Sequence, residues 1–107
     1  MHGDFSPDQV LGERRGGVRI IDLDRFGHGD PRLDLGSFLA TELLAGGTGG
    51  LTEALLDGYG RPGVGGELRP WAVHGLLTRL DEPFRSGRAD WRAQISVRLA
   101  LAEVLLR

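Results

Sequence analysis

The chain has 107 residues, of which 40% are hydrophobic, and its formal net charge is -2. This length allows one domain with a modest core, and the hydrophobic share favours a globular chain over a disordered one. A near-neutral charge without a basic run argues against a nucleic-acid-binding surface. No apolar run reaches the roughly 18 residues of a membrane helix, so we expect no membrane span.

The chain lacks three informative features. It has no Cys, which excludes disulfides and thiol catalysis and fits a cytoplasmic protein. Met1 is followed at once by polar residues, so we expect no signal peptide. All 13 residues counted as Lys and Arg are Arg. A Walker A loop and a complete kinase site both need a Lys on the nucleotide phosphates, and these residues contain none.

A small hairpin is expected at the start of the chain. Residues 2–9 are punctuated by Gly and Pro, which predicts a loop. Val10-Leu11 and Val18–Ile21 are apolar and rich in β-branched residues, so they predict two strands joined by the Gly-rich turn 12–17. Pairing of these strands would bring the first loop close to the acidic segment that begins at Asp22.

Helical periodicity dominates the remaining sequence. The expected helices span about 32–45, 51–59, 67–81 and 90–106. Asp30 and Pro31 should begin the first helix, because Asp accepts hydrogen bonds from free amides and Pro fits the first turn. The run Gly46 to Gly50 should end it. We therefore predict a mainly α single domain over residues 1–107, with a short β-hairpin followed by about four helices.

The last two helices carry further expectations. Pro83 should end the third helix, with residues 84–89 as a loop and Asp90 as the cap of the last helix. Apolar residues lie on much of the circumference of the last helix, which predicts that it is widely buried.

Two acidic segments carry candidate chemistry. Asp4 and Gln9 are five residues apart, the spacing between the base Asp and the metal-binding amide in the kinase pattern H-R-D-x-x-x-x-N. Asp22 follows an apolar strand, as the second metal-binding Asp of kinases does, and Asp24 would share its side of an extended strand. These oxygen donors, with imidazole only from His2, suit a hard cation such as Mg²⁺.

The same residues resemble the motifs of a known superfamily. His2-Gly3-Asp4-Phe5-Ser6-Pro7-Asp8-Gln9 resembles the HGDxxxxN loop of the aminoglycoside phosphotransferase and choline kinase superfamily. Residues 21–25, 29–31 and 34–36 resemble its IDxxxxxxGDPxxDL segment, and residues 82–85 with the Trp91 helix are similar to bacterial members. The resemblance covers the C-terminal lobe of the family's two-lobed, protein-kinase-like fold, while the N-lobe that supplies the Gly-rich cover and the Lys has no counterpart here.

The resemblance implies roles for individual residues. Asp4 would be the catalytic base, and Asp22 and Gln9 would be metal ligands, with Gln9 replacing the usual Asn. His2 and Asp24 would be cofactor-binding residues, although Asp24 can equally be a structural turn residue. The implied reaction transfers the ATP γ-phosphate to the hydroxyl of a small-molecule substrate, with Mg²⁺ bridging the phosphates.

An alternative function remains open at this level. The chain would then be a truncated, non-catalytic remnant or interaction module with the same fold. Such a module is expected to expose apolar surface where the missing lobe would pack, and therefore to self-associate. The remaining polar and aromatic candidates are expected to be structural or solvated; they are His28, Asp30, Asp34, Glu53, Asp57, Glu67, Trp71, His74, Asp81, Glu82, Phe84 and Trp91. The alternative for five of the carboxylates is an acidic pocket for a cationic substrate; they are Glu53, Asp57, Glu67, Asp81 and Glu82.

Overall fold

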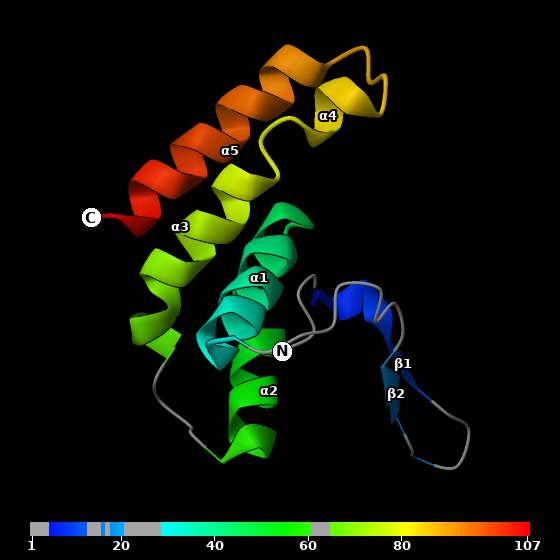
Figure 1. The fold of residues 1–107 in the computed structure, drawn as a ribbon, viewed down its shortest axis with the longest axis vertical. Coiled ribbons are helices and arrows are strands. Elements are labelled where there is room, and N and C mark those ends of the chain that lie inside the picture. Colours follow the sequence, from blue (N-terminus) through cyan, green and yellow to red (C-terminus); the bar gives the residue numbers. More distant parts are fainter. Residues whose placement is uncertain (1–4, 13–15, 17, 21–28, 61–64) are drawn as a thin grey trace.

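The chain begins with a short β-hairpin that lies to one side of a group of helices (Figure 1). The structure is a computed structural model and describes residues 5–12, 16, 18–20, 29–60 and 65–107. A 3-10 turn, η1 (Pro7–Gln9), leads directly into β1 (Val10–Gly12). β2 (Val18–Ile20) pairs with β1 in antiparallel register. The predicted hairpin is thus observed within the described residues.

The first helix, α1 (Pro31–Leu44), begins as the sequence predicts. The side chain of Asp30 accepts a hydrogen bond of 2.9 Å from the backbone N–H of Arg32, and Pro31 occupies the first turn. Hydrogen bonds from the side chain and backbone of Arg32 lower the pKa of Asp30 to about 2. Asp30 therefore has a structural role, as expected. After the helix, Gly46 adopts a φ of 89°, a conformation that favours glycine.

The next two long helices differ in how well they match their expected limits. α2 (Gly50–Tyr59) ends at Gly60, which has a φ of 88° and stops the helix. α3 (Arg69–Thr78) is preceded by a 3-10 turn, η2 (Gly65–Leu68), and is shorter at both ends than the predicted span 67–81.

The chain after α3 corrects the expectation for Pro83. This residue does not end α3, but lies in the first turn of an additional short helix, α4 (Glu82–Arg85). A proline ring is tolerated there because the N–H groups of the first turn have no partner within the helix. The expected loop 84–89 therefore begins only after Arg85.

The last helix, α5 (Trp91–Leu105), is much more exposed than its composition suggests. Ala102 is its only residue classed as buried, whereas Val97 and Val104 are more than half exposed. The expectation of burial around much of this helix is wrong because α3 and α4 contact only one side of it. Asp90 precedes the helix, but its side chain forms no capping bond and instead accepts from Arg88 and Gln94.

The core lies between α1, α2, α3 and α5, with the most extensive contact between α1 and α3. Small residues allow these two helices to approach closely. A Cβ atom added to Gly36 of α1 would lie 2.5 Å from the backbone carbonyl carbon of Trp71, and one added to Gly75 would lie 3.2 Å from Ala40 Cβ. The buried residues of this core are Leu39, Ala40, Leu56, Leu68, Ala72, Val73, Leu76 and Ala102.

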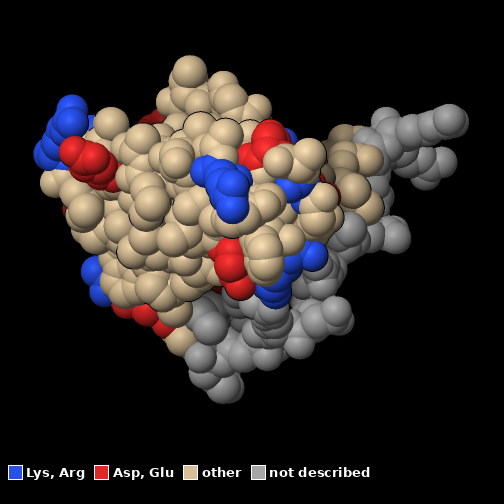
Figure 2. All heavy atoms as spheres, turned by 90° about the horizontal axis from the view of Figure 1, so that it is seen from above, with Lys and Arg blue, Asp and Glu red and all other residues tan. Residues whose placement is uncertain are grey.

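The described residues form a mainly α structure, which confirms the predicted fold class. Among them, no helix combines the length and apolar character needed to cross a membrane. Figure 2 shows that Arg and acidic side chains are interspersed on the visible face, so this face has no broad patch of one charge.

Candidate functional site

Most of the predicted site residues lie outside the described part of the chain. These residues are His2, Asp4, Asp22 and Asp24. The backbone of Gln9 ends η1, but the side chain of Gln9 is not among those described. The assignments of the catalytic base and of the metal and cofactor ligands therefore stay predictions. The described residues show how the two candidate segments are attached to the fold.

Phe5, the residue after the predicted base, is anchored on α1. Its side chain is 7% exposed, and its ring centroid lies 5.0 Å from that of Phe38. Its backbone carbonyl oxygen accepts a 2.8 Å hydrogen bond from Ser37 Oγ. Arg79 Nη2 in turn donates to Ser37 Oγ over 2.8 Å. A hydrogen-bonded link thus runs from the predicted catalytic loop through α1 to the C-terminal end of α3.

The hairpin connects the loop to the second candidate segment. Within η1, Ser6 Oγ donates a hydrogen bond to Asp8 Oδ1, and the N–H of Val10 donates to the carbonyl of Pro7. The strand register then places Val10 opposite Ile20. Val10 directly follows Gln9, and its partner Ile20 is two positions before the predicted metal ligand Asp22 in the sequence.

A buried carboxylate that the sequence analysis did not single out organises the opposite end of α1. Glu42 is 3% exposed. Its Oε1 accepts from the N–H and the hydroxyl of Thr52 at 2.8 and 2.7 Å, and its Oε2 accepts from the N–H groups of Gly49 and Leu51 at 2.9 and 3.1 Å. These four bonds satisfy donors at the N-terminus of α2, where negative charge is favourable.

The environment of Glu42 also changes its acidity. Burial alone raises the pKa of this carboxyl, but the hydrogen bonds from Thr52, Leu51 and Gly49 outweigh burial and hold the pKa below its ordinary value. Glu42 is therefore a structural anion. The sequence signal for this role was a Glu on an apolar helix face just before a Gly-rich loop.

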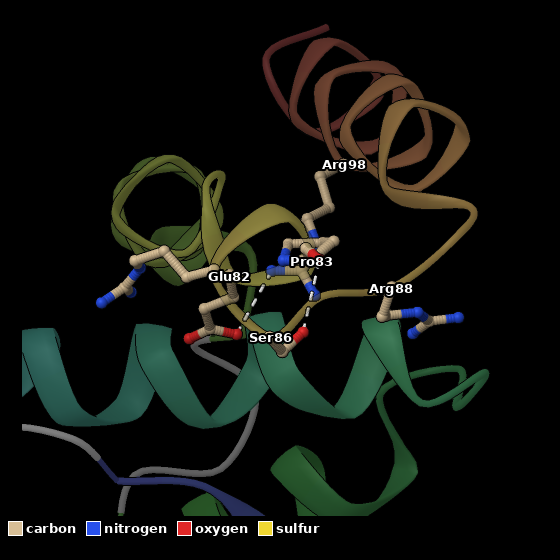
Figure 3. Close-up of a pocket in the computed structure, with 6 residues that line it drawn as sticks. Glu82, Pro83, Ser86, Arg88 and Arg98 are labelled. Atoms are coloured by element: carbon tan, nitrogen blue, oxygen red, sulfur yellow. Dashed lines mark hydrogen bonds and ion pairs between the residues drawn. The ribbon is translucent and has the colours of Figure 1, made fainter.

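A pocket of about 420 Å³ lies where α4 meets α5, and its lining residues are Glu82, Pro83, Arg85, Ser86, Arg88 and Arg98. In Figure 3, Glu82 and Arg98 extend toward each other, whereas Arg88 extends away from them. Arg98 Nη1 lies 3.3 Å from Glu82 Oε2 and also donates to the carbonyl of Arg79. Arg85 pairs with Asp81, and Arg88 pairs with Asp90. Each pocket arginine therefore already has an acidic partner.

The remaining described candidates fit structural roles. His74 is exposed on α3, and the guanidinium of Arg32 lies 4.7 Å from the ring centroid of Trp71. Phe84 and Trp91 form an edge-to-face pair with centroids 5.1 Å apart, although Phe84 is 59% exposed. Within the described ranges, no group of three or more His, Asp or Glu side chains could hold a metal ion.

Comparison with known proteins identifies the family. Residues 1–71, which include both candidate segments, match the model of the phosphotransferase enzyme family. No curated protein and no solved structure gives a significant match. The family match confirms the resemblance seen in the sequence motifs, and it spans 71 of the 107 residues. The chain belongs to the phosphotransferase enzyme family, and its function is of the phosphotransferase type.

Proposed function

We propose that this chain forms the C-terminal lobe of an ATP-dependent small-molecule phosphotransferase, with a kinase-like arrangement of its two acidic segments. The observation that carries the proposal is the family match over residues 1–71, because this range contains both segments in the expected order. The pairing of Val10 with Ile20 supports it, since this register joins the segments through one hairpin.

The proposed reaction transfers the ATP γ-phosphoryl group to a substrate hydroxyl. The hydroxyl oxygen bonds to the γ-phosphorus as the bond to the β,γ-bridging oxygen breaks, and ADP leaves. In this scheme Asp4 accepts the hydroxyl proton, and Asp22 and Gln9 hold Mg²⁺ through oxygen atoms, the donors that this cation prefers. Bound Mg²⁺ would neutralise the phosphate charge. His2 and Asp24 would contact the nucleotide.

The proposed reaction also needs a positive charge on the nucleotide phosphates, which we expect from outside the acidic segments. The family's Lys on the nucleotide phosphates has no equivalent among the 13 basic residues, which are all Arg. We propose that an N-lobe supplies this positive charge, because electrostatic stabilisation and positioning dominate phosphoryl transfer. The absence of Cys is consistent with our proposal that the reaction takes place in the cytoplasm.

Metal binding tests the proposed site directly in this chain. We would titrate Mn²⁺, a spectroscopic substitute for Mg²⁺, in the presence of ATP and follow it by electron paramagnetic resonance. The wild-type chain should form a ternary complex, and Asp22→Asn should abolish it. Asp57→Asn is the matched control, because Asp57 is an exposed carboxylate on α2. Absence of the complex in the wild-type chain, or equal binding by both variants, would overturn the proposed metal site.

Turnover separates the enzyme from a non-catalytic module. ADP formation should be measured with aminoglycoside, amino-alcohol and sugar acceptors. Asp4→Asn should lower the rate by about 10²-fold or more through loss of the general base, while metal binding is retained. The exposed apolar side chains of α5 favour the second candidate, an interaction module. Metal and ATP binding without turnover on any acceptor would support that candidate.

A further inference from the structure

The outward face of α5 has a regular pattern that the proposed reaction does not use. Ala93, Val97, Ala100 and Val104 follow one another at intervals of four, three and four residues. Positions with this spacing lie in one row along a helix and form the contact seam of paired helices. The pattern therefore describes a helix face suited to a second helix.

This row is accessible in the structure. All four residues are exposed, with Val97 54% and Val104 53% exposed. The opposite side of α5, which includes Ala102, packs on the helical core. In Figure 1, α5 runs along the edge of the helical group, and α3 lies on its inner side. Among the described elements, none covers the outward row.

Opposite charges flank this row just outside the helix, because Asp90 is the residue before α5 and Arg107 is the second residue after it. Asp90 lies three residues before Ala93, and Arg107 lies three residues after Val104. The side chains of Asp90 and Arg107 are 49% and 73% exposed. Their neighbours within the chain, Arg88 and Glu103, are also about half exposed or more, so water can replace these contacts at low cost.

We propose that the outward face of α5 binds the same face of a second copy of this chain, with the two helices antiparallel. A two-fold axis between Val97 and Ala100 would set Ala93 opposite the partner's Val104, and Val97 opposite the partner's Ala100. Each layer would then join one small and one larger side chain, which allows close and even helix packing. The same operation sets Asp90 opposite the partner's Arg107 at both ends.

The charges of Asp90 and Arg107 favour the antiparallel orientation over the parallel one. A parallel pair would place Asp90 beside the partner's Asp90 and Arg107 beside the partner's Arg107, so that like charges face each other. The antiparallel pair replaces both repulsions with attractions, and it also opposes the two helix dipoles. Charge complementarity within one chain therefore specifies a second copy as the occupant.

The size of the contact predicts a weak dimer. α5 has 15 residues, which gives a helix of roughly 22 Å. A contact of one such helix is smaller than the roughly 800 Å² per partner of a typical stable interface. Association is therefore expected at high protein concentration, with fast exchange.

Cysteine cross-linking tests both the face and the orientation, because the chain has no Cys of its own. We would prepare Ala93→Cys and Val104→Cys separately and oxidise each alone, and then as a mixture, with oxidised glutathione. The mixture should form a disulfide-linked heterodimer. Each variant alone should cross-link much less, because its two Cys residues would lie roughly 16 Å apart along the axis, beyond disulfide reach. Cross-linking of the single variants without preference for the mixture would overturn the antiparallel pair.

A charge placed in the row provides a second, independent measurement. Val97→Arg should shift the chain to monomer in sedimentation velocity at high concentration, whereas Leu99→Arg should leave the dimer unchanged. Leu99 is the matched control because it is 46% exposed on the same helix but lies outside the row. Circular dichroism would establish that both variants keep the helical content. A monomeric wild-type chain, or equal effects of the two substitutions, would overturn the proposal whatever the outcome for phosphoryl transfer.

Discussion

The contact between α1 and α3 and the attachment of the β-hairpin are built very differently. The helices approach so closely that a Cβ on Gly36 would clash with the backbone of Trp71. In the hairpin, Leu11 and Ile20 are 44% and 49% exposed, and a Cβ on Gly12 would meet no atom within 4 Å. A two-stranded hairpin alone is marginally stable in water. The described residues of the hairpin are therefore packed much less closely than the helical body formed by α1 and α3.

This difference has a consequence for motion. Regions with few buried contacts open at lower free energy than a packed core. The link from Phe5 through Ser37 to Arg79 is a described restraint on the predicted catalytic loop. Three substitutions should distinguish the stability of the helical body from that of the hairpin.

The largest effect is expected from Gly36→Ala. The new methyl group would lie 2.5 Å from the carbonyl carbon and 2.8 Å from the carbonyl oxygen of Trp71, and this backbone cannot move without separating α1 from α3. We expect a loss of about 3 kcal/mol or more in the free energy of unfolding, the upper range for overpacking. Urea unfolding followed by circular dichroism measures it. Gly58→Ala is the control, because Gly58 is exposed on α2 with open space around it; this change should stabilise by up to about 1 kcal/mol. Similar effects of the two changes would contradict the close packing.

A smaller loss in the free energy of unfolding is expected from Glu42→Gln. The amide NH₂ would replace one of the two oxygens that accept hydrogen bonds, so that two donors at the α2 N-terminus would lose their partner. We expect a loss of about 2–3 kcal/mol in the free energy of unfolding at neutral pH. Glu53→Gln, at an exposed position on α2, should change it little.

The same variant should alter the acid dependence of stability. The pKa of Glu42 is lowered in the folded chain, so its stabilisation is complete above the unfolded pKa of about 4.3 and is lost as pH falls through the folded value. Wild type should therefore lose more stability than Glu42→Gln between neutral pH and this acid range. Parallel pH curves for the two proteins would contradict the role of Glu42 as a buried anion.

The smallest loss in the free energy of unfolding is expected from Ser37→Ala. Its effect should fall mainly on the hairpin. The hydroxyl binds the carbonyl of Phe5 and accepts from Arg79, so its loss should cost about 1–2 kcal/mol. Amide hydrogen exchange in residues 5–12 should accelerate while the protection of α1 and α3 is largely kept. Thr41→Ala is the control, because the Thr41 hydroxyl bonds only to carbonyls of its own helix. Equal acceleration in both variants would show that Ser37 does not restrain the hairpin.

Local signals in the sequence predicted the elements well where one residue type determines the geometry. Asp30 with Pro31 begins α1, and Gly46 follows its end with a φ of 89°, because capping and left-handed backbone conformations depend on the residue itself. Pro83 shows the limit of such signals. A proline can follow one helix or begin the next, and the tertiary arrangement selects the second option here.

Tertiary relations could not be obtained in this way. The apolar residues of α5 predicted burial, but hydrophobic composition does not specify how many neighbours a helix has. The link between Ser37 and Arg79 joins residues 42 positions apart, so neither spacing nor propensity could identify it. For the candidate site, the motifs predicted the family, which the comparison confirmed. The roles of Asp4 and Asp22 stay predictions, because these residues lie outside the described ranges.

The carboxylate of Glu42 has one further consequence, for anion binding. The run from Gly46 to Gly50 leads into a helix N-terminus, an arrangement that in other proteins receives a phosphate group. Here the chain supplies its own substitute anion, and Thr52 and the adjoining amides are already bound to it. A phosphate approaching this loop would meet a fixed negative charge and no free donors among those amides. Glu42 thereby prevents this helix N-terminus from acting as a phosphate site.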